Sequence, residues 1–237
     1  MNIADSHVSV DCSVFAFDGE KIKILLIKRN GEEEGEAFHD KKLPGSLIYL
    51  DENLDEAATR VLSELTGLKS VTINQFKAYG SKDRTSNPAD VHWLERVQKL
   101  KIDRIITVAY IGLVRITPPM TKLLNAHDAL WMDVNEVPLL AFDHNAIIND
   151  AIAHLRHICR LEPAYLFSLL PKEFTAAQFG TLYNLMRTNK LDVRNFHKKL
   201  SSMEFIVPTG KKEDGVAHRS AGYFRFDKRL YNKRRAY

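Results

Sequence analysis

Cysteine, glycine and proline are all scarce in this sequence. Its 237 residues contain two cysteines, Cys12 and Cys159, with 11 glycines and 8 prolines. Two distant cysteines cannot form a disulfide framework or a zinc cluster, so we expect both to be buried thiols in a reducing compartment. The low glycine and proline content excludes collagen-like and low-complexity chains. With 45% hydrophobic and 27% charged residues, the composition is that of an ordinary globular protein.

Long apolar runs are also lacking. The most hydrophobic stretch, 105–114, lies between Arg104 and Arg115 and falls well short of the roughly 20 apolar residues of a membrane span. The first eleven residues do not show the basic segment and apolar segment of a secretory signal. We therefore expect a soluble, cytoplasmic protein without a membrane partner, folded as one large domain or two modest ones.

Acidic side chains are scarce in the C-terminal part of the chain. Residues 172–237 carry 15 Lys and Arg against 6 Asp and Glu, a local net charge of +9, whereas residues 1–171 have a net charge of −5. An acidic body followed by a strongly basic segment is typical of a protein that binds a polyanion such as nucleic acid. A solvated basic tail without a partner is the alternative.

Apolar and β-branched segments predict a strand-rich N-terminal part. The expected strands cover residues 8–17, 21–29, 43–50, 71–79 and 104–116. Asp18 and Gly19 predict a hairpin turn. One helix is expected between an N-cap at Asn53 and a C-terminal stop at Gly67. The polar stretches 30–40 and 80–100 are expected to be loops.

The C-terminal part has a different pattern. Apolar residues at helical spacing predict a long amphipathic helix over 144–161, which would bridge the two halves. A second helix is expected from Thr175 and a third after an N-cap at Asp192. A hairpin formed by 205–210 and 221–226 would follow. Helix, short turn, helix and hairpin together predict a winged helix-turn-helix.

The exposed face of the third helix is rich in hydrogen-bond donors. These side chains suit phosphate oxygens and purine edges: Arg194, Asn195, Lys198, Lys199 and Ser202. The hairpin turn adds groups suited to the DNA backbone or the minor groove: Lys211, Lys212, His218 and Arg219. We predict that both sets contact double-stranded DNA. A protein–protein role is the alternative, against which the local charge of +9 argues.

Residues 46–68 resemble the Nudix box, the loop–helix–loop motif of enzymes that hydrolyse nucleoside diphosphates linked to another group. The family pattern is Gly, five residues, Glu, seven residues, then Arg-Glu-apolar-x-Glu-Glu-x-Gly-apolar. The matching residues are Glu52, Arg60, Leu62, Glu64, Gly67 and Leu68. Ser46 replaces the first Gly of the pattern, and Val61 and Leu65 replace two of its glutamates.

These replacements bear on catalysis. Positions 61, 64 and 65 share one face of a helix, where three glutamates would hold the divalent cations that pyrophosphate cleavage requires. Only Glu64 remains, with Glu52 nearby, so we expect no metal site, no cofactor and no catalytic residue. We predict that the chain is not an enzyme and that Arg60 forms a structural ion pair with Glu64. An active Nudix hydrolase with a basic accessory domain is the alternative.

The whole chain resembles the Nudix-related transcriptional regulators of bacteria. In the C-terminal part the resemblance is carried by 174–210, with Arg194-Asn195-Phe196-x-x-Lys199-Leu200 at its centre. It implies an α/β fold: a Nudix-like α/β/α sandwich followed by a C-terminal winged helix-turn-helix. The implied domains are an effector-sensing and dimerisation domain at 1–142, a helical linker at 143–171 and a DNA-binding domain at 172–237. The family implies a homodimer on a palindromic operator.

The resemblance also implies a small-molecule effector. Many members of the family respond to ADP-ribose and control NAD metabolism, and one branch responds to L-arabinose and controls pentose use. Overall likeness favours that branch, so we expect a repressor of sugar utilisation that senses L-arabinose, with ADP-ribose as the alternative effector. Its site should combine polar groups with an aromatic face, and the candidates are His39, Lys42, Tyr49, Arg84 and Trp93.

Overall fold

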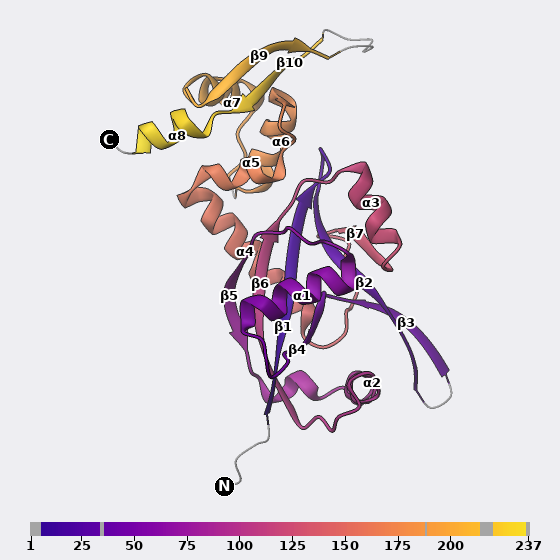
Figure 1. Cartoon of the computed structure of the whole chain (residues 1–237). Coiled ribbons are helices and arrows are strands. Elements are labelled where there is room, and N and C mark those ends of the chain that lie inside the picture. Colours follow the sequence, from indigo (N-terminus) through magenta and orange to yellow (C-terminus); the bar gives the residue numbers. More distant parts are fainter. Residues whose placement is uncertain (1–5, 34–35, 188, 214–219, 236–237) are drawn as a thin grey trace. The chain divides into compact units, whose positions relative to one another are not determined.

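The chain divides into two compact units. The computed structural model describes residues 6–33, 36–187, 189–213 and 220–235. The first unit is formed by the chain up to Ala16 with Lys23–His154, and the second by Phe17–Ile22 with Leu155–Tyr237. The long helix α4 (His144–Leu161) begins in the first unit and ends in the second (Figure 1).

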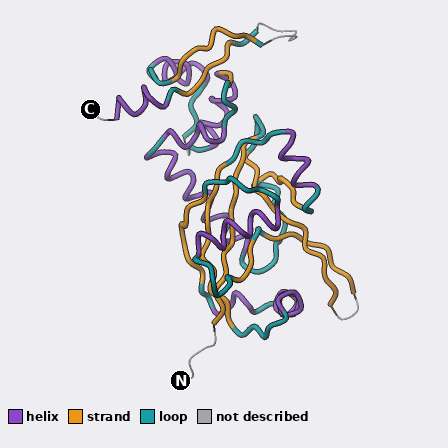
Figure 2. Tube along the Cα trace, viewed as in Figure 1, coloured by secondary structure: helices purple, strands orange, loops and turns teal. Residues whose placement is uncertain are grey.

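A seven-stranded mixed sheet forms the centre of the first unit (Figure 2). Its strands are β1 (Ser6–Phe17), β2 (Ile22–Glu33), β3 (Glu36–Lys42), β4 (Gly45–Leu47), β5 (Ile73–Tyr79), β6 (Arg104–Leu113) and β7 (Ala129–Asp133). The order is β3-β2-β1-β6-β5, with β4 paired to β1 and β7 paired to β2. β1 and β6 run parallel, with Val10 opposite Val108.

The alternation of side chains along β1 defines the two faces of the sheet. Val10, Cys12 and Val14 point to one face and pack with α1 (Leu54–Thr66) in a fully buried core. The intervening residues of β1 are polar but also buried, because α2 (Pro88–Gln98) and α4 cover the second face. The sheet is thus the middle layer of the α/β/α sandwich that the sequence predicts.

Local signals fix the ends of α1. The Asn53 side chain accepts hydrogen bonds of 3.0 Å from the N–H groups of Asp55 and Glu56, and the Glu56 carboxylate accepts one of 2.8 Å from the Asn53 N–H. This capping box satisfies donors that the first helical turn leaves open. The helix ends at Gly67, whose φ of 74° is easily adopted only by glycine. The predicted helix is confirmed at both ends.

Two expected loops are instead regular structure. Within 30–40, β2 continues and pairs with β3, with Asn30 opposite His39, so strand pairing outweighs the polar composition. Within 80–100, α2 begins at Pro88, and Asn87 caps it by accepting from the Ala89 N–H. Three further elements are not among those predicted from the sequence: α3 (Pro118–Asn125), β7 and α8 (Lys228–Arg235).

The second unit contains a winged helix-turn-helix, as predicted. Its elements after α4 are a short turn (Pro163–Tyr165), α5 (Leu166–Leu169), β8 (Phe174–Thr175), α6 (Ala176–Leu185), α7 (Val193–Ser201), β9 (Ile206–Lys212), β10 (Gly222–Phe226) and α8. The three strands form an antiparallel sheet in the order β8-β10-β9. α6 and α7 are the helix pair, and β9 and β10 form the wing.

Aromatic contacts hold this unit together. Phe167 stacks on Phe226 with ring centroids 4.3 Å apart, and Phe179 of α6 contacts the edge of Phe196 of α7 at 5.4 Å. The close approach of α6 and α7 depends on Gly180, because a Cβ there would lie 3.1 Å from the Phe196 ring. The orientation of α7 is therefore set by tight packing against α6.

The turn between α6 and α7 is fixed by one side chain, and this makes a test possible. The Asn184 amide accepts from the Leu191 N–H at 2.8 Å and donates to the Leu191 carbonyl at 2.9 Å. Asn184→Ala should leave both groups without these partners and lower the free energy of unfolding of the second unit by about 1–3 kcal/mol. Urea denaturation measures the change, and the exposed Asn189→Ala is the matched control. Equal stability of the two variants would contradict this role.

Candidate effector site and nucleic-acid interface

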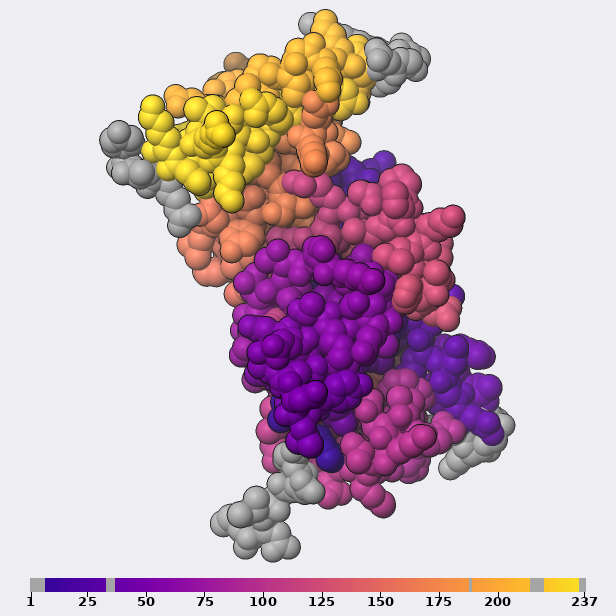
Figure 3. Space-filling model, in the orientation of Figure 1, coloured from indigo at the N-terminus to yellow at the C-terminus, as the bar shows by residue number. Residues whose placement is uncertain are grey.

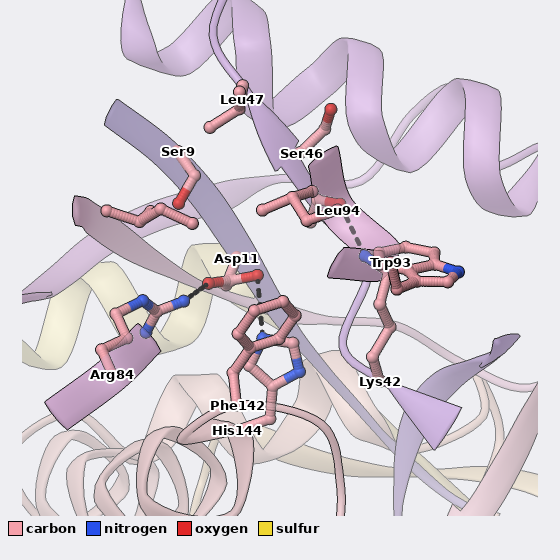
Figure 4. A pocket seen from close by; sticks show the side chains of 12 residues that line it. Ser9, Asp11, Lys42, Ser46, Leu47, Arg84, Trp93, Leu94, Phe142 and His144 are labelled. Carbon is pink, nitrogen blue, oxygen red and sulfur yellow. Dashed lines mark hydrogen bonds and ion pairs between the residues drawn. The ribbon is translucent and has the colours of Figure 1, made fainter. Parts of the chain in front are cut away.

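A cluster of buried charged groups lies on the second face of the first unit, around Asp11 in β1 (Figure 4). Arg84, from the turn after β5, donates from Nη2 to Asp11 Oδ2 at 2.8 Å and also pairs with Asp143. His144, the first residue of α4, places Nε2 3.3 Å from Asp11 Oδ1. Lys42, at the end of β3, completes the cluster and donates to the Gly45 carbonyl at 2.7 Å. Three separate segments thus converge on one carboxylate.

The hydrogen bonds of His144 define its protonation. The Leu43 backbone N–H donates to Nδ1 at 3.1 Å, so Nδ1 is an acceptor and carries no proton. The ring proton therefore lies on Nε2 and faces the Asp11 carboxylate. In this arrangement His144 is a neutral ring that links β1 to the beginning of α4 and to the backbone after β3.

The environment shifts the pKa values of two members of the cluster. Burial alone would raise the pKa of Asp11, but His144, Arg84 and Lys42 outweigh it and hold that pKa well below its usual range. Burial lowers the pKa of Lys42 to about 8, although the attraction of Asp11 opposes this shift. Lys42 is therefore a buried amine that can lose its proton close to neutral pH.

A second buried ion pair adjoins the first. Arg29 of β2 lies 2.6 Å from Asp90 of α2 and also pairs with Asp40 of β3. Its guanidinium group lies 5.2 Å from the centre of the Trp93 ring. The Asp90 carboxylate accepts a 2.8 Å hydrogen bond from the Phe142 N–H. This network connects α2 to the segment immediately before α4.

The charged groups and two rings surround a small cavity. Asp11, Lys42, Arg84, Trp93 and Phe142 contribute to its walls, and its volume is about 30 Å³. That volume holds about one water molecule. Gly45 also lines the cavity, and a Cβ at this position would lie 1.9 Å from the Asp11 carboxylate, so only glycine leaves room for the cluster.

Three of the five predicted effector residues meet at this cavity: Lys42, Arg84 and Trp93. The other two lie elsewhere. His39 is exposed on β3 and hydrogen-bonds Asn30 at 2.8 Å, and the half-exposed Tyr49 ring lies 3.8 Å from the Arg60 guanidinium group.

Asp11 and His144 are not among the site residues predicted from the sequence. The signal for Asp11 was the alternation of Ser9, Asp11 and Ser13 with apolar residues along β1. Such alternation ordinarily indicates a solvent-facing side, whereas here helices cover that side. His144 carried no comparable signal, because it lies more than 100 positions from Lys42 and Asp11 in the sequence and only the fold brings it to them.

The helix that resembles the Nudix box has an apolar face where the pattern has carboxylates. Val61 is fully buried in the core, and Leu65 packs against the same core. The remaining carboxylates are engaged by Arg60, which lies 2.6 Å from Glu52 and 3.0 Å from Glu64. In the space-filling view the segment around α1, in purple, covers one side of the first unit (Figure 3). In the described part of the chain, no group of three or more His, Cys, Asp or Glu could hold a metal ion.

The predicted DNA contacts on α7 differ in whether their side chains already bond to other residues of the protein. Arg194 and Lys198 are exposed and make no ion pair with another described residue. The side-chain amide of Asn195 donates to the carboxylate of Asp192, the N-cap of α7, at 2.6 Å. Lys199 is exposed in the last turn of α7, and Ser202 is the C-cap of that helix, where its hydroxyl donates to the Lys199 carbonyl.

On the wing, Lys212 is exposed, whereas Lys211 is paired with Glu173 at 2.8 Å. His218 and Arg219 lie outside the described residues. Of the described helices, none combines the length and the apolar character that crossing a membrane requires.

The two units together define a class of protein: an α/β/α sandwich with a buried polar site, joined through α4 to a basic winged helix-turn-helix. Comparison with known families agrees with this class. The chain belongs to the NUDIX family, whose domain profile matches residues 5–155. The profile of the NrtR DNA-binding winged helix domain matches residues 166–226.

Individual relatives match nearly the whole chain or a part of it. The "ADPR responsive transcriptional repressor NtrR" of Acinetobacter baylyi is 25% identical over 223 residues, which are 92% of this chain and 81% of that protein. An "ADP-ribose pyrophosphatase" of Methanocaldococcus jannaschii is 31% identical over 128 residues, 54% of this chain and 64% of the relative. A crystal structure of Shewanella oneidensis NrtR with a 27mer DNA has the same fold, with a TM-score of 0.66, 22% identity, and coverage of 92% and 93% of the two chains.

These comparisons correct the expected effector. The prediction of an L-arabinose-sensing regulator of sugar utilisation is wrong, because the relative that matches nearly the whole chain is an ADP-ribose-responsive repressor. The arabinose prediction rests on the overall likeness of the chain to one branch of the regulator family and not on the residues at the cavity.

Lys42 allows a test of the buried cluster. Its pKa of about 8 in the folded protein, against 10.5 for an ordinary lysine, means that the unfolded chain binds more protons between these pH values. The free energy of unfolding should therefore rise, by about 1–2 kcal/mol between pH 8 and pH 9.5. Lys42→Met should remove this rise, and Lys41→Met should retain it, in urea denaturation at each pH. The same rise in all three proteins would show that Lys42 is not its source.

Proposed function

We propose that this protein is a transcriptional repressor that binds double-stranded operator DNA through its winged helix and releases it when the NUDIX unit binds ADP-ribose. The observation that carries the proposal is the similarity over 92% of the chain to a repressor named for its response to ADP-ribose. Through the family that this chain resembles, the genes controlled would be those of NAD metabolism. We place the protein in the cytoplasm, where its DNA lies.

Charge and exposure support DNA binding by the second unit. Residues 172–237 carry a net charge of +9, and Arg194 and Lys198 extend from α7 into solvent. Such side chains can contact phosphates and base edges when a recognition helix enters the major groove. One recognition helix contacts only a few base pairs, so we propose a homodimer whose two-fold symmetry matches a palindromic operator.

The cavity around Asp11 supports recognition of ADP-ribose by the first unit. ADP-ribose carries two negatively charged phosphates and an adenine ring. Lys42 and Arg84 supply cations for the phosphates, and Trp93 and Phe142 supply rings for stacking. Sites for ligands of this size have volumes of about 300–1,000 Å³. The cavity of about 30 Å³ must therefore open when the ligand binds.

This opening suggests how the signal is transmitted. Movement of α2, which carries Trp93, or of the segment that carries Phe142 would enlarge the cavity. Phe142 lies two residues before α4, and His144 at the start of α4 contacts Asp11. We propose that the ligand changes the position of the beginning of α4. Because α4 continues into the second unit, such a change can alter DNA binding.

Hydrolysis of ADP-ribose is the second candidate function, favoured by the 31% identity to an ADP-ribose pyrophosphatase. Against it stand Val61 and Leu65, which pack in the core where metal-binding carboxylates would be needed. Arg60 also engages both remaining carboxylates of the motif. We therefore propose sensing without turnover.

The proposed response can be measured directly. ADP-ribose should weaken the binding of the full chain to DNA from upstream of its own operon by about tenfold, a coupling of about 1.4 kcal/mol. Fluorescence anisotropy of labelled DNA measures this change, with L-arabinose as the control ligand. Operator affinity that stays the same at saturating ADP-ribose would overturn the proposed effector. Measuring AMP formed from ADP-ribose in the presence of Mg²⁺ tests the second candidate, because cleavage of the pyrophosphate bond yields AMP and ribose 5-phosphate, and turnover that Glu64→Gln abolishes would establish it.

The recognition helix offers a separate test. Lys198→Gln should weaken operator binding several-fold and reduce the slope of log affinity against log salt by about 1, because one phosphate contact is lost. Lys172→Gln removes an exposed lysine outside α7 and is the matched control. Both variants should bind ADP-ribose like the unaltered protein. If the two substitutions had equal effects on DNA binding, α7 would not be the recognition helix.

A further inference from the structure

The second unit contains a cavity of its own, separate from the one at Asp11. It lies between the end of α4, the end of α6, the C-terminal part of α7 and helix α8. Its volume is about 370 Å³, within the range of cavities that bind small molecules. α8 is drawn in yellow in Figure 1, near the C-terminal end of the chain.

The charged side chains that line this cavity all have the same sign. They are Arg160, Arg187, Lys199 and Arg234, and none of the described lining residues is acidic. Among the described residues, none of the four forms an ion pair. Two of them bond only to neutral groups: Arg187 donates to the Tyr183 hydroxyl at 3.1 Å, and Arg234 donates to the Ser202 carbonyl at 3.2 Å. Four exposed cations around one cavity make an anion its favoured ligand.

Aromatic side chains form the rest of the wall. Tyr183 and Phe205 are more than nine-tenths buried, and Tyr231 of α8 contacts the edge of Phe205 with ring centroids 4.9 Å apart. The Tyr231 hydroxyl donates to the nearby Glu162 carboxylate, so this acid is already engaged. Burial raises the pKa of the lining Cys159 thiol to about 12, so the thiol is uncharged at neutral pH and does not compete with an anionic ligand.

We propose that this cavity is a second ligand site, which binds a small phosphorylated compound with a flat ring, a nucleoside monophosphate. The cations match a phosphate, and the partly exposed Tyr231 ring can contact a base, whereas the Tyr183 and Phe205 rings are already packed against other side chains. The DNA backbone is the competing occupant, since Lys199 belongs to the predicted DNA contacts. The cavity favours the small molecule because it is a hollow of about 370 Å³ with cations on several sides, whereas phosphates on a duplex are contacted by side chains along an open surface.

The site also has a consequence for DNA binding. Lys199 of α7 and Ser202, the C-cap of that helix, also belong to the cavity wall, so a bound phosphate would neutralise charge beside the recognition helix. Nucleotide bound here should weaken operator binding. This inference does not depend on ADP-ribose being the effector of the first unit, and either can hold without the other.

Isothermal titration of AMP into the full chain tests the proposal. AMP should bind, and Arg160→Gln and Arg187→Gln should each weaken its binding by tenfold or more, because each removes a charged partner of the phosphate. Arg156→Gln is the matched control: Arg156 is also an exposed arginine of α4, four residues before Arg160, and does not line the cavity. Thermal unfolding verifies that all the variants are folded.

Three results would overturn the proposal. The first is an absence of AMP binding by the unaltered chain. The second is AMP binding that Arg160→Gln and Arg187→Gln leave unchanged but Lys42→Met abolishes, which would assign the ligand to the cavity in the first unit. The third is a loss of operator affinity in the two arginine variants while AMP binding stays at its original strength, which would identify the cavity as a contact for the DNA backbone.

Discussion

The burial of one carboxylate organises the first unit. A charge that has left water is stable only when cations and hydrogen-bond donors surround it, and Asp11 at the centre of β1 is in this position. Its partners come from three places: Lys42 from the end of β3, Arg84 from the turn after β5 and His144 from the start of α4. The requirement to compensate Asp11 therefore ties distant segments together on one face of the sheet. It also demands a glycine at position 45, where any side chain would displace the carboxylate.

The two faces of the central sheet differ in their chemistry. On the α1 face the motif retains its helix, its caps and its arginine, but its interior positions are Val61 and Leu65, which add to the core. On the opposite face a polar cavity remains, lined by cations and rings. The proposed sensing without turnover uses both features: a cavity that can bind a ligand on one face, and few carboxylates for metal-assisted cleavage on the other. In the proposed function, ligand binding at the cavity changes DNA binding by the winged helix.

The described part of the second unit is stabilised by aromatic packing and not by buried ion pairs around one carboxylate. Stacked and edge-on phenylalanine rings fill its small core, so its charged side chains can remain on the outside. Asn184 fixes the turn that sets the direction of α7. The last helix, α8, docks through Tyr231 and Arg234 and closes one side of a cationic cavity.

The sequence by itself determined the local features and the overall class. The capping box at Asn53, the stop at Gly67, the N-cap at Asp192 and the basic third of the chain are short-range signals, and they predicted α1, α7 and a DNA-binding winged helix correctly. Only the tertiary structure decided where the polar residues of β1 point, because alternation does not reveal whether helices cover the second face. It likewise decided that Asp11 and His144 meet, that 30–40 pairs as strands, and that four cations gather around one cavity. Such groupings depend on long-range contacts between segments that are far apart in the chain, and no local pattern encodes them.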